Sequence, residues 1–150
     1  MNLKDEINED LKSAMKSGDK LRLETIRSIR ALILEFEKSG KDKVLTSEEE
    51  IKMLNGAVKK RRDSIEQFNL AGRTELAQKE EAELKILMSY MPKQLSSDEV
   101  YQEVKRIAEE INAIGKEDFP KLMSKAAQLL KGKADGKLVK TLVDKYLGII

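Results

Sequence analysis

The sequence predicts an all-α protein that is divided into two helical domains. Apolar side chains recur every three or four residues along almost the whole chain, which is the period of an amphipathic helix. No segment shows the strict alternation of apolar and polar residues that is typical of a half-buried strand. Pro92 interrupts this pattern, and proline both lacks an amide hydrogen and disfavours helix at the residue before it. We therefore expect an N-terminal domain over residues 1–91 and a smaller domain over residues 96–150.

About four helices are expected in the N-terminal domain. Their boundaries are marked by capping and turn residues: Gly18, Asp19, Ser39-Gly40, Thr46 with Glu49, Ala71-Gly72 and Thr74. The fourth helix is expected to end near Tyr90. Its three glutamates, Glu80, Glu81 and Glu83, are expected largely on the solvated face.

Three helices are expected in the C-terminal domain. Ser96 and Glu99 have the spacing of a capping box and predict the start of the first helix, which fades at residues 112–115. Asp118 is placed to cap the second helix, and the third follows a turn at residues 132–136. The interdomain connector contains Tyr90, Pro92 and Leu95. We expect Tyr90, Leu95 or Tyr101 to hold the small domain against the larger one.

Composition excludes several kinds of chemistry. The chain has no cysteine and no histidine, so it lacks thiol nucleophiles, disulfides and the usual general base, and we expect neither a metal nor a cofactor. Carboxylate pairs such as Glu80 with Glu83 have no nucleophile or base beside them. We expect no catalytic residues. The N-terminus has no apolar signal region and no segment is long and apolar enough to span a membrane, which predicts a cytoplasmic protein without membrane contact.

Charge is concentrated locally, although the whole chain carries only +2. The run at residues 59–62 (Lys-Lys-Arg-Arg) falls inside a helix, where consecutive side chains point in different directions, so we interpret it as a solvated face. Residues 119–150 differ, because they carry seven basic and two acidic side chains. The candidate phosphate contacts there are Lys131, Lys133, Lys137 and Lys140, next to a helix N-terminus.

The turn that displays these lysines is interpreted as a structural corner. Gly132 is expected to be the C-cap of one helix, Asp135 the N-cap of the next, and Gly136 the first residue after that cap. A nucleotide-binding P-loop would need four residues between the glycines and Ser or Thr after the lysine, where this chain has three residues and Leu138. Few aromatic residues lie nearby, so backbone contacts to folded RNA fit better than base stacking. A solvated basic helix end is the alternative.

Three blocks of sequence resemble the YqeY family, and their spacing covers essentially the whole chain. They are Ala71-Gly72-Arg73-Thr74-Glu75-Leu76-Ala77 with Lys79-Glu80 and Glu83, Tyr90-Met91-Pro92-Lys93-Gln94-Leu95-Ser96, and Gly132-Lys133-Ala134-Asp135-Gly136-Lys137-Leu138-Val139. The YqeY family is similar to the tail of the B subunit of the glutamine-dependent aspartyl/glutamyl-tRNA amidotransferase, which helps to hold the tRNA. Those tails typically have Asn-Pro where this chain has Asp135-Gly136.

The resemblance implies a non-catalytic accessory module that associates with tRNA, another structured RNA or amidotransferase subunits. It also links the chain to carbon-nitrogen ligase activity with glutamine as amido-N-donor, but it supplies no catalytic residue. The alternative is a helical protein-interaction adaptor without a nucleic-acid role.

Overall fold

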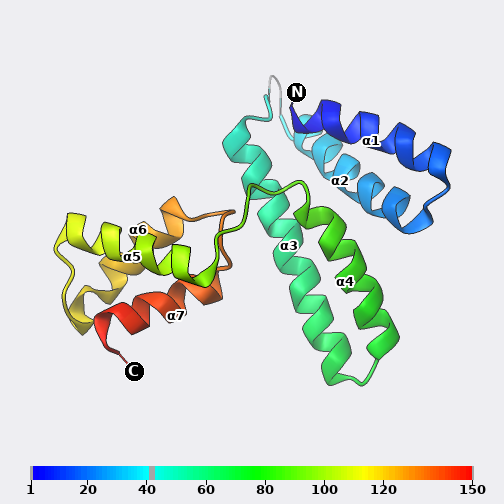
Figure 1. The fold of residues 1–150 in the computed structure, drawn as a ribbon. Coiled ribbons are helices and arrows are strands. Elements are labelled where there is room, and N and C mark those ends of the chain that lie inside the picture. Colours follow the sequence, from blue (N-terminus) through cyan, green and yellow to red (C-terminus); the bar gives the residue numbers. More distant parts are fainter. Residues whose placement is uncertain (1, 41–42, 150) are drawn as a thin grey trace. The chain divides into compact units, whose positions relative to one another are not determined.

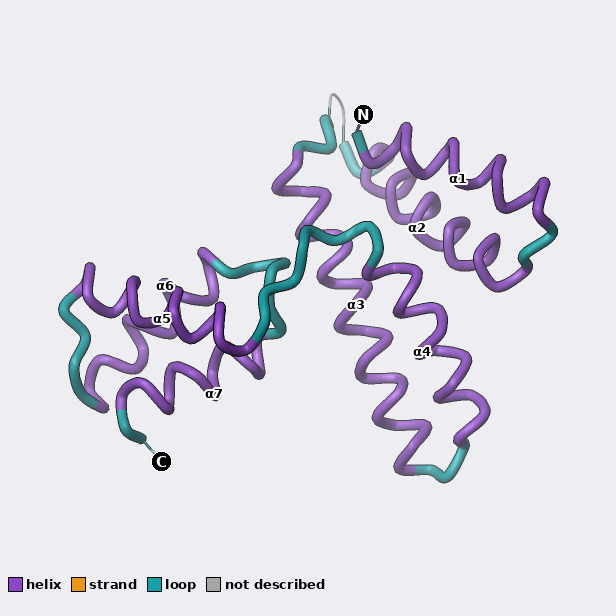
Figure 2. Tube along the Cα trace, viewed as in Figure 1, coloured by secondary structure: helices purple, strands orange, loops and turns teal. Residues whose placement is uncertain are grey.

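The computed structural model describes residues 2–40 and 43–149, and within these ranges it contains seven α-helices, one short 3-10 helix and no strand. Figure 1 shows the order of the helices along the chain, and Figure 2 shows that loops and turns make up the remainder. The all-α prediction is confirmed. The chain divides into two compact units, an N-terminal unit (Met1–Met91) and a C-terminal unit (Pro92–Ile150).

The N-terminal unit consists of two helical hairpins. α1 (Leu3–Ser17) packs against α2 (Lys20–Lys38), and α3 (Ser47–Leu70) packs against α4 (Thr74–Met88). α2 also contacts α4, which joins the hairpins. Their inward apolar stripes form one core, made by Leu3, Ile7, Ala14, Ile26, Ile29, Ile33, Leu54, Val58, Leu87 and Met91. Burial of these stripes, rather than helix propensity, supplies most of the stability of such helices.

Local capping chemistry sets the helix boundaries of this unit. Gly18 adopts a left-handed backbone (φ 72°) after α1, a conformation that L side chains disfavour. Asp19 then accepts a hydrogen bond from the Arg22 amide and begins α2, and Thr46 accepts one from the Glu49 amide and begins α3. α4 ends at Met88, slightly earlier than the sequence predicts.

The C-terminal unit contains α5 (Ser97–Ile111), the 3-10 helix η1 (Lys116–Asp118), α6 (Phe119–Leu129) and α7 (Gly136–Leu147). All three α-helices contact one another. They enclose a second core of buried residues: Val100, Val104, Ile107, Ala108, Ala113, Leu122, Ala126, Leu130, Val139, Leu142, Val143 and Leu147. The unit therefore has a hydrophobic core of its own.

Asp118 has a different role from the one that its position predicts. Its side chain does not cap α6. Its Oδ2 instead accepts hydrogen bonds from the amides of Ile114 (2.9 Å) and Gly115 (3.1 Å), so it closes the loop after α5. Asp118 is the last residue of the 3-10 turn and has a helical backbone (φ -88°, ψ -1°) instead of the extended one usual for a capping residue, so its side chain points back to the loop before the turn.

Candidate functional site

The connector and the basic corner form one surface in the C-terminal unit, although they are far apart in sequence. Gln94 Nε2 donates hydrogen bonds to the carbonyl oxygens of Gly132 (2.7 Å) and Pro92 (2.9 Å). The Leu95 amide donates to the Lys133 carbonyl oxygen at 2.9 Å. We call residues 92–95 and 131–137 together the corner surface. Two of the sequence blocks that carry the family resemblance therefore meet in space.

The backbone of the corner is fixed by short-range hydrogen bonds. The Leu130 carbonyl oxygen accepts from the amides of Lys133 (2.9 Å) and Ala134 (3.2 Å), which turns the chain sharply after α6. Gly132 is not the C-cap that the sequence predicts, because α6 ends earlier, with Leu130 as its C-cap. Gly132 lies two residues beyond, buried and with φ 78°. A left-handed backbone at this point favours glycine.

Asp135 is the N-cap of α7, and its Oδ1 accepts a hydrogen bond from the Lys137 amide at 3.5 Å. Its carboxylate therefore lies where an external anion would otherwise meet the positive end of the helix dipole. Gly136 follows as the first residue of α7, and a side chain there would meet nothing within 4 Å. The lysines, rather than the helix N-terminus, are thus the groups that can attract phosphate.

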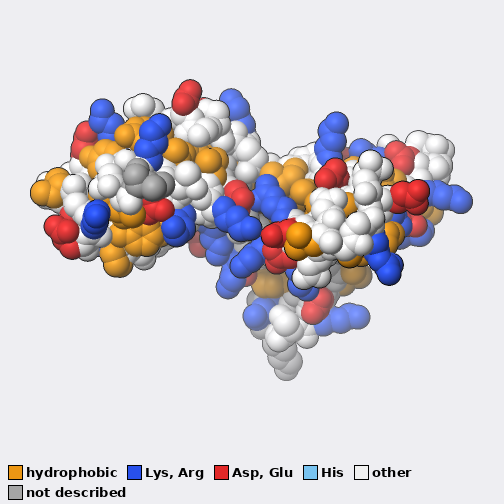
Figure 3. Space-filling model, turned by 90° about the horizontal axis from the view of Figure 1, so that it is seen from below, with side chains coloured by type: hydrophobic (Ala, Val, Ile, Leu, Met, Phe, Trp, Pro, Cys, Tyr) orange, Lys and Arg blue, Asp and Glu red, His pale blue; other side chains and the backbone are white. Residues whose placement is uncertain are grey.

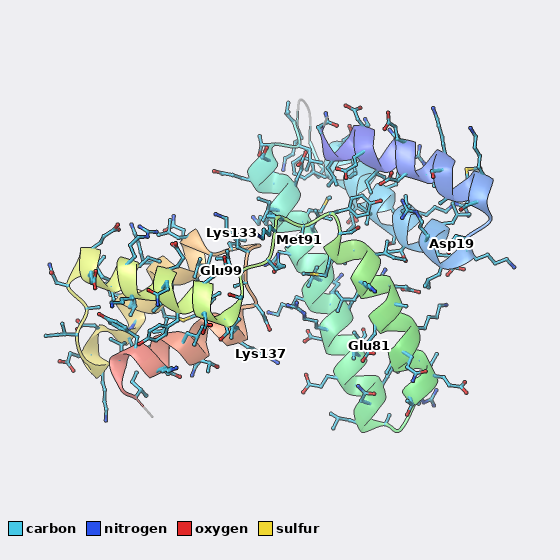
Figure 4. The ribbon with its side chains drawn as sticks, viewed as in Figure 1. Asp19, Glu81, Met91, Glu99, Lys133 and Lys137 are labelled. Atoms are coloured by element: carbon cyan, nitrogen blue, oxygen red, sulfur yellow. The ribbon has the colours of Figure 1, made fainter. Side chains whose placement is uncertain are left out.

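The four candidate lysines are not equivalent. Lys131, Lys133 and Lys137 are exposed on the corner surface, and Figure 4 shows Lys133 at the turn and Lys137 at the beginning of α7. Lys140 is engaged within the unit, because its Nζ donates to Asp144 Oδ2 at 2.9 Å and lies 5.7 Å from the centre of the Phe119 ring. Asp144 is only 8% exposed, whereas the Lys140 side chain is 61% exposed, so the pair is an i,i+4 contact within α7 whose lysine still reaches the surface.

Lys93 is a further basic residue of the corner surface, and sequence reasoning missed it. It is exposed, and its backbone is held beside the corner because the neighbouring Gln94 and Leu95 are hydrogen bonded to Gly132 and Lys133. The local sequence around Lys93 does not indicate that the connector is hydrogen bonded to the corner. Charges of both signs are mixed on the face that Figure 3 shows, so a phosphate site in this chain depends on such a local cluster rather than on a general field.

The α5 N-terminus, which follows the connector directly, has a complete capping box. Ser96 Oγ accepts from the Glu99 amide (3.2 Å), and Glu99 Oε1 accepts from the Ser96 amide (3.0 Å). The hydrogen bond that the Ser96 amide donates to the Glu99 carboxylate lowers the pKa of Glu99, with smaller contributions from the Ser96 side chain and from the charge of Lys93. The pKa of Asp118 is lowered in the same way by the amides of Ile114 and Gly115.

We expect these two carboxylates to make the C-terminal unit sensitive to acid. A folded-state pKa below the unfolded one means that the stabilisation is present above the unfolded pKa, about 4 for these side chains, and is lost as pH falls through the folded pKa. Glu99→Gln combined with Asp118→Asn should therefore flatten the loss of stability below about pH 4. Thermal unfolding across acidic pH checks this. An unchanged pH profile in the double variant would contradict it.

Tyr90 belongs to the N-terminal unit. Its hydroxyl group donates to Asp10 Oδ2 at 2.6 Å, and its ring packs against the first core. Burial, together with the Asp10 carboxylate, raises the pKa of Tyr90 above its usual range. Leu95 packs against the second core instead. The residues predicted for the connector are thus divided between the units.

An ion-pair network lies at the interface of α3 and α4, where the sequence suggested only solvated charges. Arg61 Nη1 pairs with Glu83 Oε2 and, at 3.2 Å, with Glu80 Oε2, and Arg61 Nη2 donates to Ser28 Oγ at 3.3 Å. Glu83 is 9% exposed, which contradicts its predicted place on the solvated face. Lys59 and Lys60, from the same basic run, are exposed.

The described part of the chain contains neither a membrane-spanning helix nor a candidate metal cluster. None of its helices combines the length and apolar character needed to cross a membrane. Residues 2–40 and 43–149 contain no group of three or more acidic side chains arranged to hold a metal ion.

A family model described as Yqey-like protein matches residues 4–147. The chain belongs to the Yqey-like family. This agrees with the resemblance of its three sequence blocks, two of which meet at the corner surface. Because the match covers both units, the family assignment applies to the whole arrangement of helices described above.

Several curated relatives of this Yqey-like chain carry the same name, altered inheritance of mitochondria protein 41, mitochondrial. The relative from Pyrenophora tritici-repentis is 31% identical over 93% of this chain and 77% of its own length. Those from Eremothecium gossypii (36% identical) and Kluyveromyces lactis (37% identical) match 57% and 56% of this chain. The chain spans about half the length of these last two proteins, 46% and 45%.

These names correct one expectation and support another. The relatives are named as mitochondrial proteins, which contradicts the cytoplasmic location predicted from the sequence. That prediction relied on the lack of apolar segments, a property that does not distinguish one aqueous compartment from another. Neither the family description nor the relatives' names give an enzymatic activity, which supports a non-catalytic accessory protein.

Proposed function

We propose that this Yqey-like protein is an accessory RNA-binding module whose corner surface contacts the phosphate backbone of tRNA or another folded RNA. The observation that carries the proposal is the gathering of exposed Lys93, Lys131, Lys133 and Lys137 on two hydrogen-bonded segments. Lysines bind phosphate as point charges and read no base sequence, so the expected binding is weak, salt-dependent and selective for RNA shape.

The amidotransferase resemblance supports the same proposal. The tail of the B subunit helps to hold the tRNA while a separate domain performs amide transfer, and this chain resembles the tail. By the same resemblance, the protein partners of this chain would be amidotransferase subunits. Because no catalytic residue is carried over, a glutamine-dependent amidation assay of the chain alone should give no product.

The proposal predicts a specific effect of reversing two charges. Lys133→Glu with Lys137→Glu should weaken binding to bulk tRNA at low salt by at least about tenfold and should reduce the salt dependence by about two ions. Each substitution replaces a phosphate contact with repulsion. Filter binding or fluorescence anisotropy across a salt series measures both quantities.

A matched control distinguishes a specific effect of the corner surface on RNA binding from a general effect of net charge. Lys105→Glu with Lys125→Glu makes the same change of net charge at exposed positions inside α5 and α6. This control should retain most of the binding. Equal loss in both variants, or wild-type binding that does not depend on salt, would contradict the proposal.

A further inference from the structure

The N-terminal unit contains an open apolar groove between α2 and α3 that no feature of the RNA proposal uses. Its volume is about 640 Å³. Leu32 and Phe36 line it from α2, and Met53 and Ala57 line it from α3. All four side chains are only half-buried, so the groove exposes apolar surface of the N-terminal unit. The Arg61 network closes one end, since Arg61, Ser28 and Glu80 also line the groove.

Gly56 lies in the middle of the groove wall and has no structural reason within the unit to be glycine. It is inside α3, its φ is not positive, and a Cβ atom there would meet nothing within 4 Å. Glycine inside a helix destabilises it by about 1 kcal/mol relative to alanine. The feature that a side chain at residue 56 would obstruct is therefore the open space of the groove itself.

Two lysines flank Gly56 on the same side of α3. Lys52, Gly56 and Lys60 are spaced four residues apart, so they form one row along the helix, and both lysines line the groove and are exposed. No carboxylate of the described residues pairs with either ammonium group. Two carboxylates line the groove: Glu80 is already paired with Arg61, and Glu49 lies on α3, three residues before Lys52. The two lysines lie about 12 Å apart along the axis, roughly two helical turns.

We propose that this groove binds an amphipathic α-helix of a partner protein, with its apolar face on Leu32, Phe36, Met53 and Ala57 and acidic side chains opposite Lys52 and Lys60. Carboxylates two turns apart on the bound helix match the spacing of the lysines, and Gly56 lets the two helix backbones come close. A fatty acid would satisfy one ammonium group only and would not need a glycine between them. The proposal is independent of RNA binding, because every residue involved lies in the N-terminal unit.

The test begins with selection of a displayed library of helical peptides, about 15 residues long, against the full chain. We expect enrichment of apolar residues at helical spacing with Asp or Glu two turns apart. A selected peptide should then shift the methyl resonance of Met53 and leave that of Met123, in the C-terminal unit, unchanged. Failure to enrich acidic amphipathic peptides, or a shift at Met123 instead, would overturn the proposal.

Two variants test the contacts. Gly56→Leu fills the groove, and since its Cβ has open space and leucine favours helix, the variant should fold at least as stably as the wild type while peptide affinity falls by at least about tenfold. Lys52→Glu with Lys60→Glu should cause a comparable loss, whereas Lys12→Glu with Lys16→Glu on α1 makes the same charge change and should not. Unaltered affinity in both groove variants would contradict the proposal.

Two further measurements distinguish peptide binding in the groove from lipid binding there and from RNA binding at the corner surface. Dodecanoate, used as a lipid probe, should shift Met53 weakly or not at all, and strong binding of dodecanoate without peptide binding would identify a lipid site instead. Lys133→Glu with Lys137→Glu should leave peptide binding intact. Failure of the groove and failure of the RNA proposal are thereby distinguishable.

Discussion

Replacing Ile107 by alanine is expected to unfold the C-terminal unit under conditions in which the N-terminal unit remains folded. Ile107 is 0% exposed and belongs to the core formed by α5, α6 and α7. Removing its buried methyl groups leaves a cavity and should destabilise the unit by about 3–4 kcal/mol. A unit of about 60 residues has only a few kcal/mol of stability, so this loss should remove most of it.

The measurement is thermal unfolding followed by NMR, with methyl groups of each core as separate probes. Ile114→Ala is the matched control, because Ile114 is 85% exposed and its truncation should change stability by less than about 0.5 kcal/mol. The same experiment tests the prediction that each unit is a domain able to fold alone. One shared transition that shifts for both cores would contradict the boundary predicted at Pro92.

Replacing Arg61 by leucine is expected to destabilise the N-terminal unit by about 3 kcal/mol, because it leaves the Glu83 carboxylate buried without its cation. The side chains of Arg61 and Glu83 are 17% and 11% exposed, so water replaces the lost partner poorly. Lys60→Leu is the matched control on the same helix, and it should have a much smaller effect since Lys60 is exposed. Urea unfolding of the variants gives the comparison.

A double variant distinguishes the loss of the ion pair from a loss of packing. Arg61→Leu with Glu83→Leu removes both charges, and replacing a buried pair by apolar side chains is often close to neutral. We therefore expect the double variant to recover most of the stability that Arg61→Leu loses. If the double variant is less stable than Arg61→Leu, the network acts through packing, and the electrostatic explanation is wrong.

The helices themselves were predictable, because each has a regular apolar stripe and most have a capping residue at the expected position. Thr46, Ser96 and Asp135 all cap the helices that follow them. These signals act over a few residues, so they do not depend on the tertiary arrangement. Asp118 departs from this rule because it ends a 3-10 turn with a helical backbone, so its carboxylate binds the amides of the loop before the turn instead of those of α6.

The sequence did contain an indication that Arg61 and Glu83 are buried, although both lie in strongly charged segments. Arg61 follows Leu54 and Val58 at helical spacing, so it continues the buried stripe of α3, and Glu83 is four residues before buried Leu87 on α4. Interpreting residues 59–62 together as a solvated face overlooked the buried position of Arg61. The periodicity of the neighbouring apolar residues, applied to each charge separately, would have found it.

The composition of the corner surface could not be predicted from local sequence. The contacts of Gln94 with Gly132 and of Leu95 with Lys133 join segments 38 residues apart, and they depend on how α5, α6 and α7 pack. Sequence reasoning therefore found the lysines after α6 but missed Lys93. The ion pair of Lys140, another of the predicted phosphate contacts, with Asp144 was not indicated by the sequence pattern.

The attachment of Gln94 and Leu95 to the corner shortens the segment that joins the two units. Met91 is buried in the first core, and from Gln94 onward the chain is hydrogen bonded within the second unit. Only Pro92 and Lys93 lie between these anchors, and proline fixes one of their backbone torsions. The connector therefore has few free backbone torsions of its own.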